Sequence, residues 1–290
     1  MEGRSAIDRR EADMIAADKI EAAGRHVLYC QKSIGSAFGL AVILNLFAAT
    51  PSLAVIGGSP VAAGSPQQRA IAAITSGTAA CTGVFIAADM VLTAAHCIHG
   101  PADTIKVATG GSRQSSVPLD VIAVRVHEAY DQAQHNDLAL IRVKPRQGYA
   151  FAVNPVTRIT TPLPGDSILA LGYGRTARNA ASNQNLYSKR LTVAGRRDKD
   201  RAFFVDQRGG GICDGDSGGP ALVEDKSGLA LAGIASAVYS PAGINDICRG
   251  EADYTDVRAY RSWIEKTMTA LRRKGAQAPA AASGKRGTPS

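Results

Sequence analysis

The sequence predicts an all-β fold of the sandwich or barrel type, with one helix near the C-terminus. After Val55, short apolar stretches alternate with clusters of Gly, Pro, Asp and Asn, which favours a sandwich or barrel over alternating strands and helices. The clearest stretches are 83–86, 121–124, 138–141 and 167–171. From about Val257 to Leu271, apolar residues recur at i, i+3 and i+4, the pattern of a helix.

Length and composition are those of a globular protein. The chain has 290 residues, enough for one large or two small domains, and 45% of them are hydrophobic. Only 5% are aromatic, so the core must consist mostly of Ala, Val, Leu and Ile. We find no internal repeat.

The net charge of +8 lies entirely after residue 54, because residues 1–54 carry equal numbers of acids and bases. Five bases follow Lys266, where there are no acids: Arg272, Arg273, Lys274, Lys285 and Arg286. Such an end can contact anionic surfaces, but no nucleic-acid module accompanies it. We therefore expect residues 273–290 to be a solvated, disordered tail, with no nucleic acid as partner.

Residues 33–54 are uncharged and resemble a secretory signal. Basic residues precede the segment, and it ends in Ser52-Leu53-Ala54, a small-x-small terminus. A membrane anchor is the alternative, but it needs about 20 apolar residues, and the strongly apolar part here is shorter. We expect cleavage after Ala54, with membrane contact only during export, and a secreted or periplasmic protein. Residues 1–32 are long for a signal's basic region, so translation starts downstream, at Met14 for example, or the extension is unusual.

The cysteine count fits an oxidising compartment. Of the five cysteines, Cys30 would be removed with the signal, leaving the even number of four. Four cysteines allow three pairings, and the count does not choose among them.

Residues 213–220 read CDGDSGGP and suggest a nucleophilic serine at Ser217. Flanking glycines expose the hydroxyl and let the N–H groups of Gly215 and Ser217 converge on one point, an oxyanion hole. Each such donor stabilises a transition state by roughly 3–4 kcal/mol. The same letters also satisfy the G-x-S-x-G elbow of α/β-hydrolases, but that fold needs a histidine after the serine, and none follows Ser217.

A serine hydroxyl needs a base, and His96 in VLTAAHC is the candidate. Asp137 in HNDLALIRV is suited to orienting the imidazole and stabilising its protonated form. His96 and His99 could instead suggest a metal pair, but no carboxylate or cysteine grouping supports it. We expect no metal or other cofactor.

These three segments resemble the His, Asp and Ser blocks of the trypsin/chymotrypsin family, in that family's order. His96 and Asp137 are 41 residues apart, and Asp137 and Ser217 are 80 apart, as in a compact member with short loops. The likeness spans about Val55 to Leu271. It implies two six-stranded antiparallel β-barrels packed together, with the active site between them, in a protease domain at residues 55–272. Short loops and a simple signal favour a bacterial member, acting as a monomer on protein or peptide substrates.

The resemblance also assigns supporting residues. Gly172-Tyr173-Gly174 looks like the family's glycine–aromatic–glycine strand, and Ser236 stands where a serine bonds the catalytic aspartate. The implied disulfides are Cys81 with Cys97, holding the histidine loop, and Cys213 with Cys248, holding the serine loop.

Val55-Ile56-Gly57-Gly58 looks like the family's mature N-terminus, whose amine pairs with the aspartate before the nucleophile, here Asp216. Breaking such a buried pair costs roughly 3–5 kcal/mol. Because the expected signal cleavage frees Val55, signal peptidase itself would produce the active enzyme, without the short propeptide of most digestive relatives.

Three positions are implied to shape the specificity pocket: Gly211 at its floor, and Val238 and Ala252 on its walls. Gly211 replaces the aspartate that gives Lys/Arg preference, and Ala237 replaces the usual tryptophan. Side chains on the walls would shorten the pocket, so we expect cleavage after small aliphatic residues. The alternatives are an inactive binding protein on this fold and an esterase sharing the acyl-enzyme chemistry.

Overall fold

The computed structural model describes residues 55–113, 116–131, 133–145, 158–175, 185–197, 199, 201–226, 228–240, 243 and 245–276. The expected signal segment, Cys30 and residues 277–290 of the expected tail lie outside these ranges. Among the described helices, none combines the length and apolar character that crossing a bilayer requires.

The first barrel is an antiparallel sheet with the strand order β6-β5-β2-β3-β4-β8-β7. Its strands are β2 (Ile71–Ser76), β3 (Ala79–Ala87), β4 (Met90–Thr93), β5 (Ile105–Thr109), β6 (Val117–Leu119), β7 (Val121–Val126) and β8 (Ala139–Val143). Only Asp120 separates β6 from β7, so the two act as one bent strand that joins both ends of the sheet. Counted this way, the described strands form the predicted six-stranded barrel.

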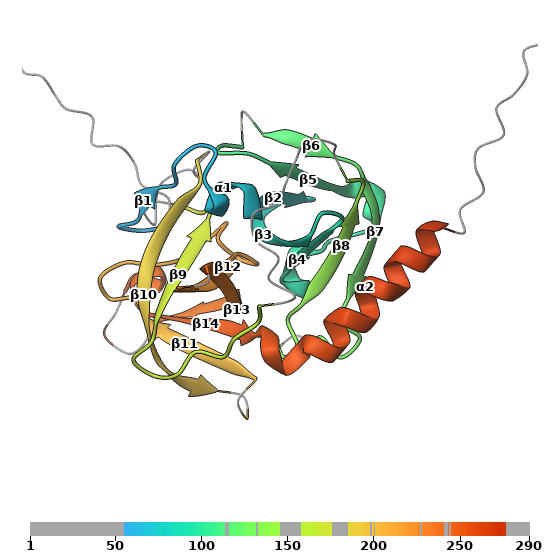
Figure 1. Cartoon of the computed structure of the whole chain (residues 1–290). Helices are drawn as coiled ribbons and strands as arrows, with labels where there is room; N and C mark the ends of the chain where they lie inside the picture. The colour runs from blue at the N-terminus through green and yellow to red at the C-terminus, as the bar shows by residue number, and fades with distance from the viewer. Residues whose placement is uncertain are drawn as a thin grey trace, which may run out of the picture. The chain divides into compact units, whose positions relative to one another are not determined.

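The second barrel closes through β9, which pairs with both β10 and β12. Its strands are β9 (Ser167–Gly172), β10 (Tyr187–Arg197), β11 (Ala202–Asp206), β12 (Pro220–Asp225), β13 (Gly228–Tyr239) and β14 (Glu251–Asp256). The two-residue strand β1 (Ser59–Pro60) adds to β10 at the edge. The predicted pair of six-stranded barrels is therefore confirmed, and Figure 1 shows them as a cyan-to-green and a yellow-to-orange group of strands.

Alternation along the strands explains which faces are buried. In β5, Ile105, Val107 and Thr109 are buried while Lys106 is exposed, as a period of two requires. The short helix α1 (Pro66–Ala70) precedes β2. Ser65 caps its N-terminus, and the Ser65 hydroxyl accepts a hydrogen bond from the N–H of Gln68.

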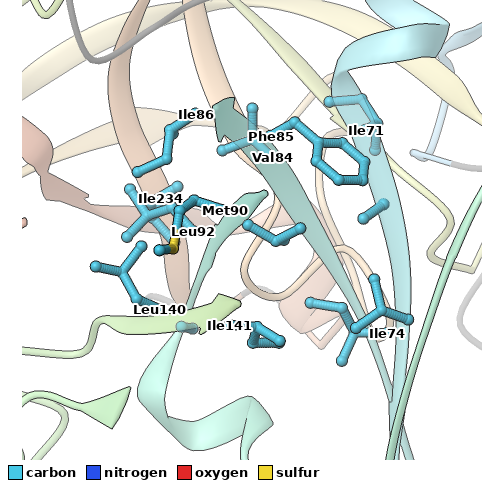
Figure 2. Close-up of a cluster of buried hydrophobic side chains, with 14 of the residues drawn as sticks. Ile71, Ile74, Val84, Phe85, Ile86, Met90, Leu92, Leu140, Ile141 and Ile234 are labelled. Carbon is cyan, nitrogen blue, oxygen red and sulfur yellow. The ribbon is translucent and has the colours of Figure 1, made fainter. Parts of the chain in front are cut away.

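One buried apolar cluster spans both barrels and fixes their relation. Figure 2 shows Ile234 of β13, in the second barrel, among aliphatic side chains of the first, including Leu92 and Leu140. Leu171 and Leu222 of the second barrel belong to the same cluster. Loops that leave the two barrels beside this shared core are thus held in a fixed relation to each other.

The C-terminal helix differs from its predicted limits. Val257–Tyr260 forms a 3₁₀ turn, because the Asp256 side chain accepts a hydrogen bond from the Arg258 N–H and ends the strand there. The α-helix α2 then runs from Arg261 to Ala276, past Leu271 and into the segment expected to be disordered. Ile264, Met268 and Leu271 are buried, and α2 packs on β7 and β8.

Candidate active site

His96 lies on a 3₁₀ turn, Ala95–Cys97, directly after β4. A disulfide joins Cys97 to Cys81 of β3, with 6.1 Å between their Cα atoms, and holds this turn against the barrel wall. The second disulfide joins Cys213 to Cys248, with 5.0 Å between Cα atoms. Both predicted disulfides are therefore present.

Asp137 is fully buried and accepts three hydrogen bonds. Its Oδ2 lies 2.7 Å from His96 Nδ1, and its Oδ1 accepts from the His96 backbone N–H at 3.0 Å. Ser236 Oγ donates to Oδ2 at 2.6 Å, as the sequence implied. Because Asp137 Oδ2 already accepts the Ser236 hydroxyl and faces His96 as an acceptor, His96 Nδ1 is the donor, and Nε2 is the free acceptor of the imidazole.

Sequence reasoning missed the role of Asn136. Its φ of +54° is in the left-handed region, where Asn is tolerated better than most residues, and the turn directs the next side chain inward. Asn136 Nδ2 donates to the Ala129 carbonyl at 2.8 Å, and its Oδ1 accepts from the Tyr260 hydroxyl at 3.1 Å. Asparagine before the aspartate was visible in the sequence, but its partners are not sequence neighbours.

Ser217 lies in a tight double turn between Cys213 and Gly219. Gly215 has φ +93°, and a Cβ there would lie 2.9 Å from the Cα of Gly174, so only glycine fits. Within the described part of the chain, the N–H groups of Gly215 and Ser217 have no hydrogen-bond acceptor. Two unengaged backbone donors beside a serine hydroxyl suit an oxyanion hole.

Thr82 of β3 connects the first barrel to this turn, and sequence reasoning missed it. The residue is fully buried. Its N–H donates to the Ser217 carbonyl at 2.8 Å, and its Oγ1 donates to the Gly215 carbonyl at 2.8 Å. The same Oγ1 accepts from the Tyr173 N–H at 3.2 Å. One side chain thus holds the turn that carries both candidate oxyanion donors.

Asp216 is a buried carboxyl without a cation in contact among the described residues. Its oxygens accept from the N–H groups of Gly174 at 2.8 Å and Cys213 at 2.9 Å. Burial raises the pKa of Asp216 to about 7, although these two N–H donors and the more distant Arg113 guanidinium oppose the rise.

Val55 is buried in the second barrel's core, in the same apolar cluster as Ile212. The following N–H, of Ile56, donates to the Gly211 carbonyl at 2.8 Å. The chain is continuous through Val55, so its nitrogen is an amide and not an ammonium group. No hydrogen bond joins Val55 to Asp216 among the described residues.

His96 and Ser217 line one cavity of about 360 Å³. The rest of its lining is Gln134, Ile212, Cys213, Asp214, Ala235, Ser236, Ala237, Val238 and Tyr239. Of the three expected specificity positions, Val238 lines this cavity, whereas Gly211 and Ala252 are buried and are not part of its lining. Ile212, which the sequence did not single out, also lines this cavity.

One group of metal-type ligands occurs among the described residues: His96 with Cys81 and Cys97, whose ligand atoms lie within 4.8 Å of one another. The two sulfurs are bonded to each other, and a disulfide sulfur is not the thiolate that binds metals. This group gives no argument for a metal site.

The family model described as Trypsin matches residues 55–264, most of the chain. The chain belongs to the trypsin family. As a member it is a serine endopeptidase, a hydrolase whose substrates are proteins, and the expected family is confirmed.

Curated trypsin-family proteins of insects are similar to it along most of their length. Serine protease SP24D of Anopheles gambiae is 29% identical, over 74% of this chain and 81% of that protein. Trypsin alpha of Drosophila melanogaster is 28% identical, over 75% of this chain and 88% of that protein.

Proposed function

We propose that this trypsin-family protein cleaves peptide bonds through an acyl-enzyme on Ser217, with His96 as general base and Asp137 as its orienting partner. The observation that carries the proposal is the pair of contacts from Asp137 to His96, at 2.7 and 3.0 Å. They fix the ring so that Nε2 is the basic nitrogen, in a cavity that His96 shares with Ser217.

The reaction runs in two halves. Ser217 Oγ attacks the scissile carbonyl carbon while His96 Nε2 takes its proton, and the N–H groups of Gly215 and Ser217 bind the resulting oxyanion. His96 then gives the proton to the leaving amine as the C–N bond breaks. A water molecule attacks the acyl-enzyme, with His96 again as base, and releases the acid and free Ser217.

Cleavage after Ala54 is proposed as the activating step. It would convert the Val55 amide into an ammonium group. The next residue, Ile56, is bonded to Gly211 in the segment that leads to Asp216. Asp216 is the buried carboxyl whose pKa is raised by burial. A charge pair there would relieve the cost of that buried group and brace the oxyanion turn. N-terminal sequencing of exported protein is expected to begin at Val55, and any other first residue contradicts this step.

Secretion into an oxidising compartment follows from the same proposal. The two bonded cysteine pairs and the uncharged segment 33–54 support it, since disulfides persist mainly outside the cytosol.

Preference for small aliphatic residues at the cleavage site is proposed from the cavity beside Ser217. Ile212, Val238 and Ala237 supply apolar surface there. A panel of peptide amides varied at the residue before the scissile bond tests this preference. Alanine and valine are expected to be cleaved fastest, and faster cleavage after arginine or phenylalanine contradicts it.

A further inference from the structure

Gln207 lies directly after β11 and is buried, with 1% of its surface exposed. Its side chain is held at both polar ends by one residue: Oε1 accepts from the Ile212 N–H at 3.0 Å, and Nε2 donates to the Ile212 carbonyl at 3.0 Å. The Gln207 backbone is also bonded, to Gly250 and Gly210. A buried amide paired this way has a single position and cannot turn away cheaply.

The amide occupies the space that a side chain at position 211 would need. A Cβ built on Gly211 would lie 2.2 Å from Gln207 Oε1 and 2.6 Å from Gln207 Cβ. Both distances are far inside van der Waals contact. The group that fills the space beside Gly211 is therefore the Gln207 side chain, from four residues earlier in the chain.

Ile212 is fixed by the same pair of hydrogen bonds. Its side chain lines the Ser217 cavity, whose lining also includes Val238 and contains neither Gly211 nor Gln207. Ile212 and Val238 thus form part of the cavity wall, and Gln207 lies beneath that wall only through its contact with Ile212. Both polar atoms of Gln207 are engaged by the Ile212 backbone.

We propose that Gln207 is a positioning residue that sets the depth of the specificity pocket: its side chain fills the pocket's lower part and pins Ile212 as the floor. The inference rests on the proposed function at Ser217 and deepens it. On this proposal, a long apolar side chain before the scissile bond meets Ile212 and is cleaved more slowly than a small one. Cationic side chains bind poorly beside Ile212 and Val238, because Asp214, the carboxylate in this lining, is exposed and already paired with Arg175.

The first test compares Gln207→Ala with the unchanged enzyme on peptide amides that differ only in Ala, Leu, Phe or Lys before the scissile bond. Active sites are counted with a fluorophosphonate that labels Ser217. We expect kcat/KM for Leu relative to Ala to rise at least about tenfold in Gln207→Ala. Arg208→Ala, an exposed change on the same turn, is the control and should leave the ratio unchanged. A uniform loss across all substrates, with the ratio constant, overturns the proposal.

A second test needs no activity. Gly211→Ala should lower the urea midpoint of unfolding strongly, because its Cβ overlaps Gln207, whereas Gly209→Ala, whose Cβ meets nothing within 4 Å, should change it little. In a Gln207→Gly background the shift caused by Gly211→Ala should fall to less than half. Additive shifts overturn the proposal. If the unchanged enzyme cleaves no peptide amide, or cleaves fastest after large residues, the proposed function is contradicted. The coupling between Gln207 and Gly211 in unfolding still tests this inference in that case.

Discussion

The Thr82 hydroxyl donates a hydrogen bond to the Gly215 carbonyl at 2.8 Å, from the first barrel to the serine turn of the second. The two residues are 133 positions apart in the chain. The peptide that Thr82 holds lies between the two candidate oxyanion donors, Gly215 N–H and Ser217 N–H. The hydroxyl is therefore placed to control the orientation of both.

Replacing Thr82 by Val keeps the shape and removes the hydroxyl. The Gly215 carbonyl and the Tyr173 N–H then lose a buried partner, at a cost of about 1–3 kcal/mol. We expect kcat to fall about 10- to 100-fold with KM nearly unchanged, and a peptide boronate, which mimics the tetrahedral state, to bind proportionally more weakly. Thr82→Ser should restore most of the activity. A rise in KM alone contradicts this role.

The pH dependence of stability should differ between the uncut and cut chains. In the uncut chain, burial raises the pKa of Asp216 from 3.8 to about 7. A raised folded pKa stabilises the fold below about pH 4, and this contribution is lost as the pH rises to about 7. After cleavage, pairing with the Val55 ammonium should lower the Asp216 pKa instead.

Thermal melts from pH 4 to 8 of the full-length chain, in a Ser217→Ala background that prevents self-cleavage, measure this difference. We expect Tm to fall as the pH rises through this range, and Asp216→Asn to flatten the profile. Protein beginning at Val55 should show no such fall. Identical profiles for the two forms are incompatible with the Val55–Asp216 pair.

Ser236→Ala removes one of the three hydrogen bonds that Asp137 accepts. A hydrogen bond contributes about 0.5–1.5 kcal/mol, and the two contacts from His96 remain, so we expect kcat to fall about tenfold at most. Ser262→Ala, on the exposed side of α2, is the matched control. Wild-type kcat in the Ser236 variant means that His96 alone positions the carboxylate.

The sequence was sufficient for what lies in contiguous segments. His96, Asp137 and Ser217 each stand in a short motif, and their order and spacing predicted the family and its two barrels. Thr82 and Gln207 could not be found this way, because their roles depend on contacts made only after the chain folds. Thr82 meets the serine turn across the interface between the barrels, and a glutamine in a loop has no signature.

Local hydrogen bonds account for one helix boundary and one cavity-lining residue that the sequence did not predict. The helical pattern from Val257 gave no sign that the Asp256 side chain would cap a 3₁₀ turn before α2. Ile212 lines the cavity beside Ser217 although the sequence did not single it out, while Gly211 lies outside that lining, with the Gln207 side chain beside it. Both differences come from side-chain to backbone hydrogen bonds, which periodicity does not report.

The most direct test of the proposed mechanism is hydrolysis of a peptide amide by protein beginning at Val55, beside its Ser217→Ala variant and the Ser262→Ala control. We expect the unchanged enzyme and Ser262→Ala to cleave equally, and Ser217→Ala to lose activity by a factor on the order of 10⁴–10⁶. Equal hydrolysis by the Ser217→Ala variant, or none by folded protein with a free Val55 amine, would contradict it.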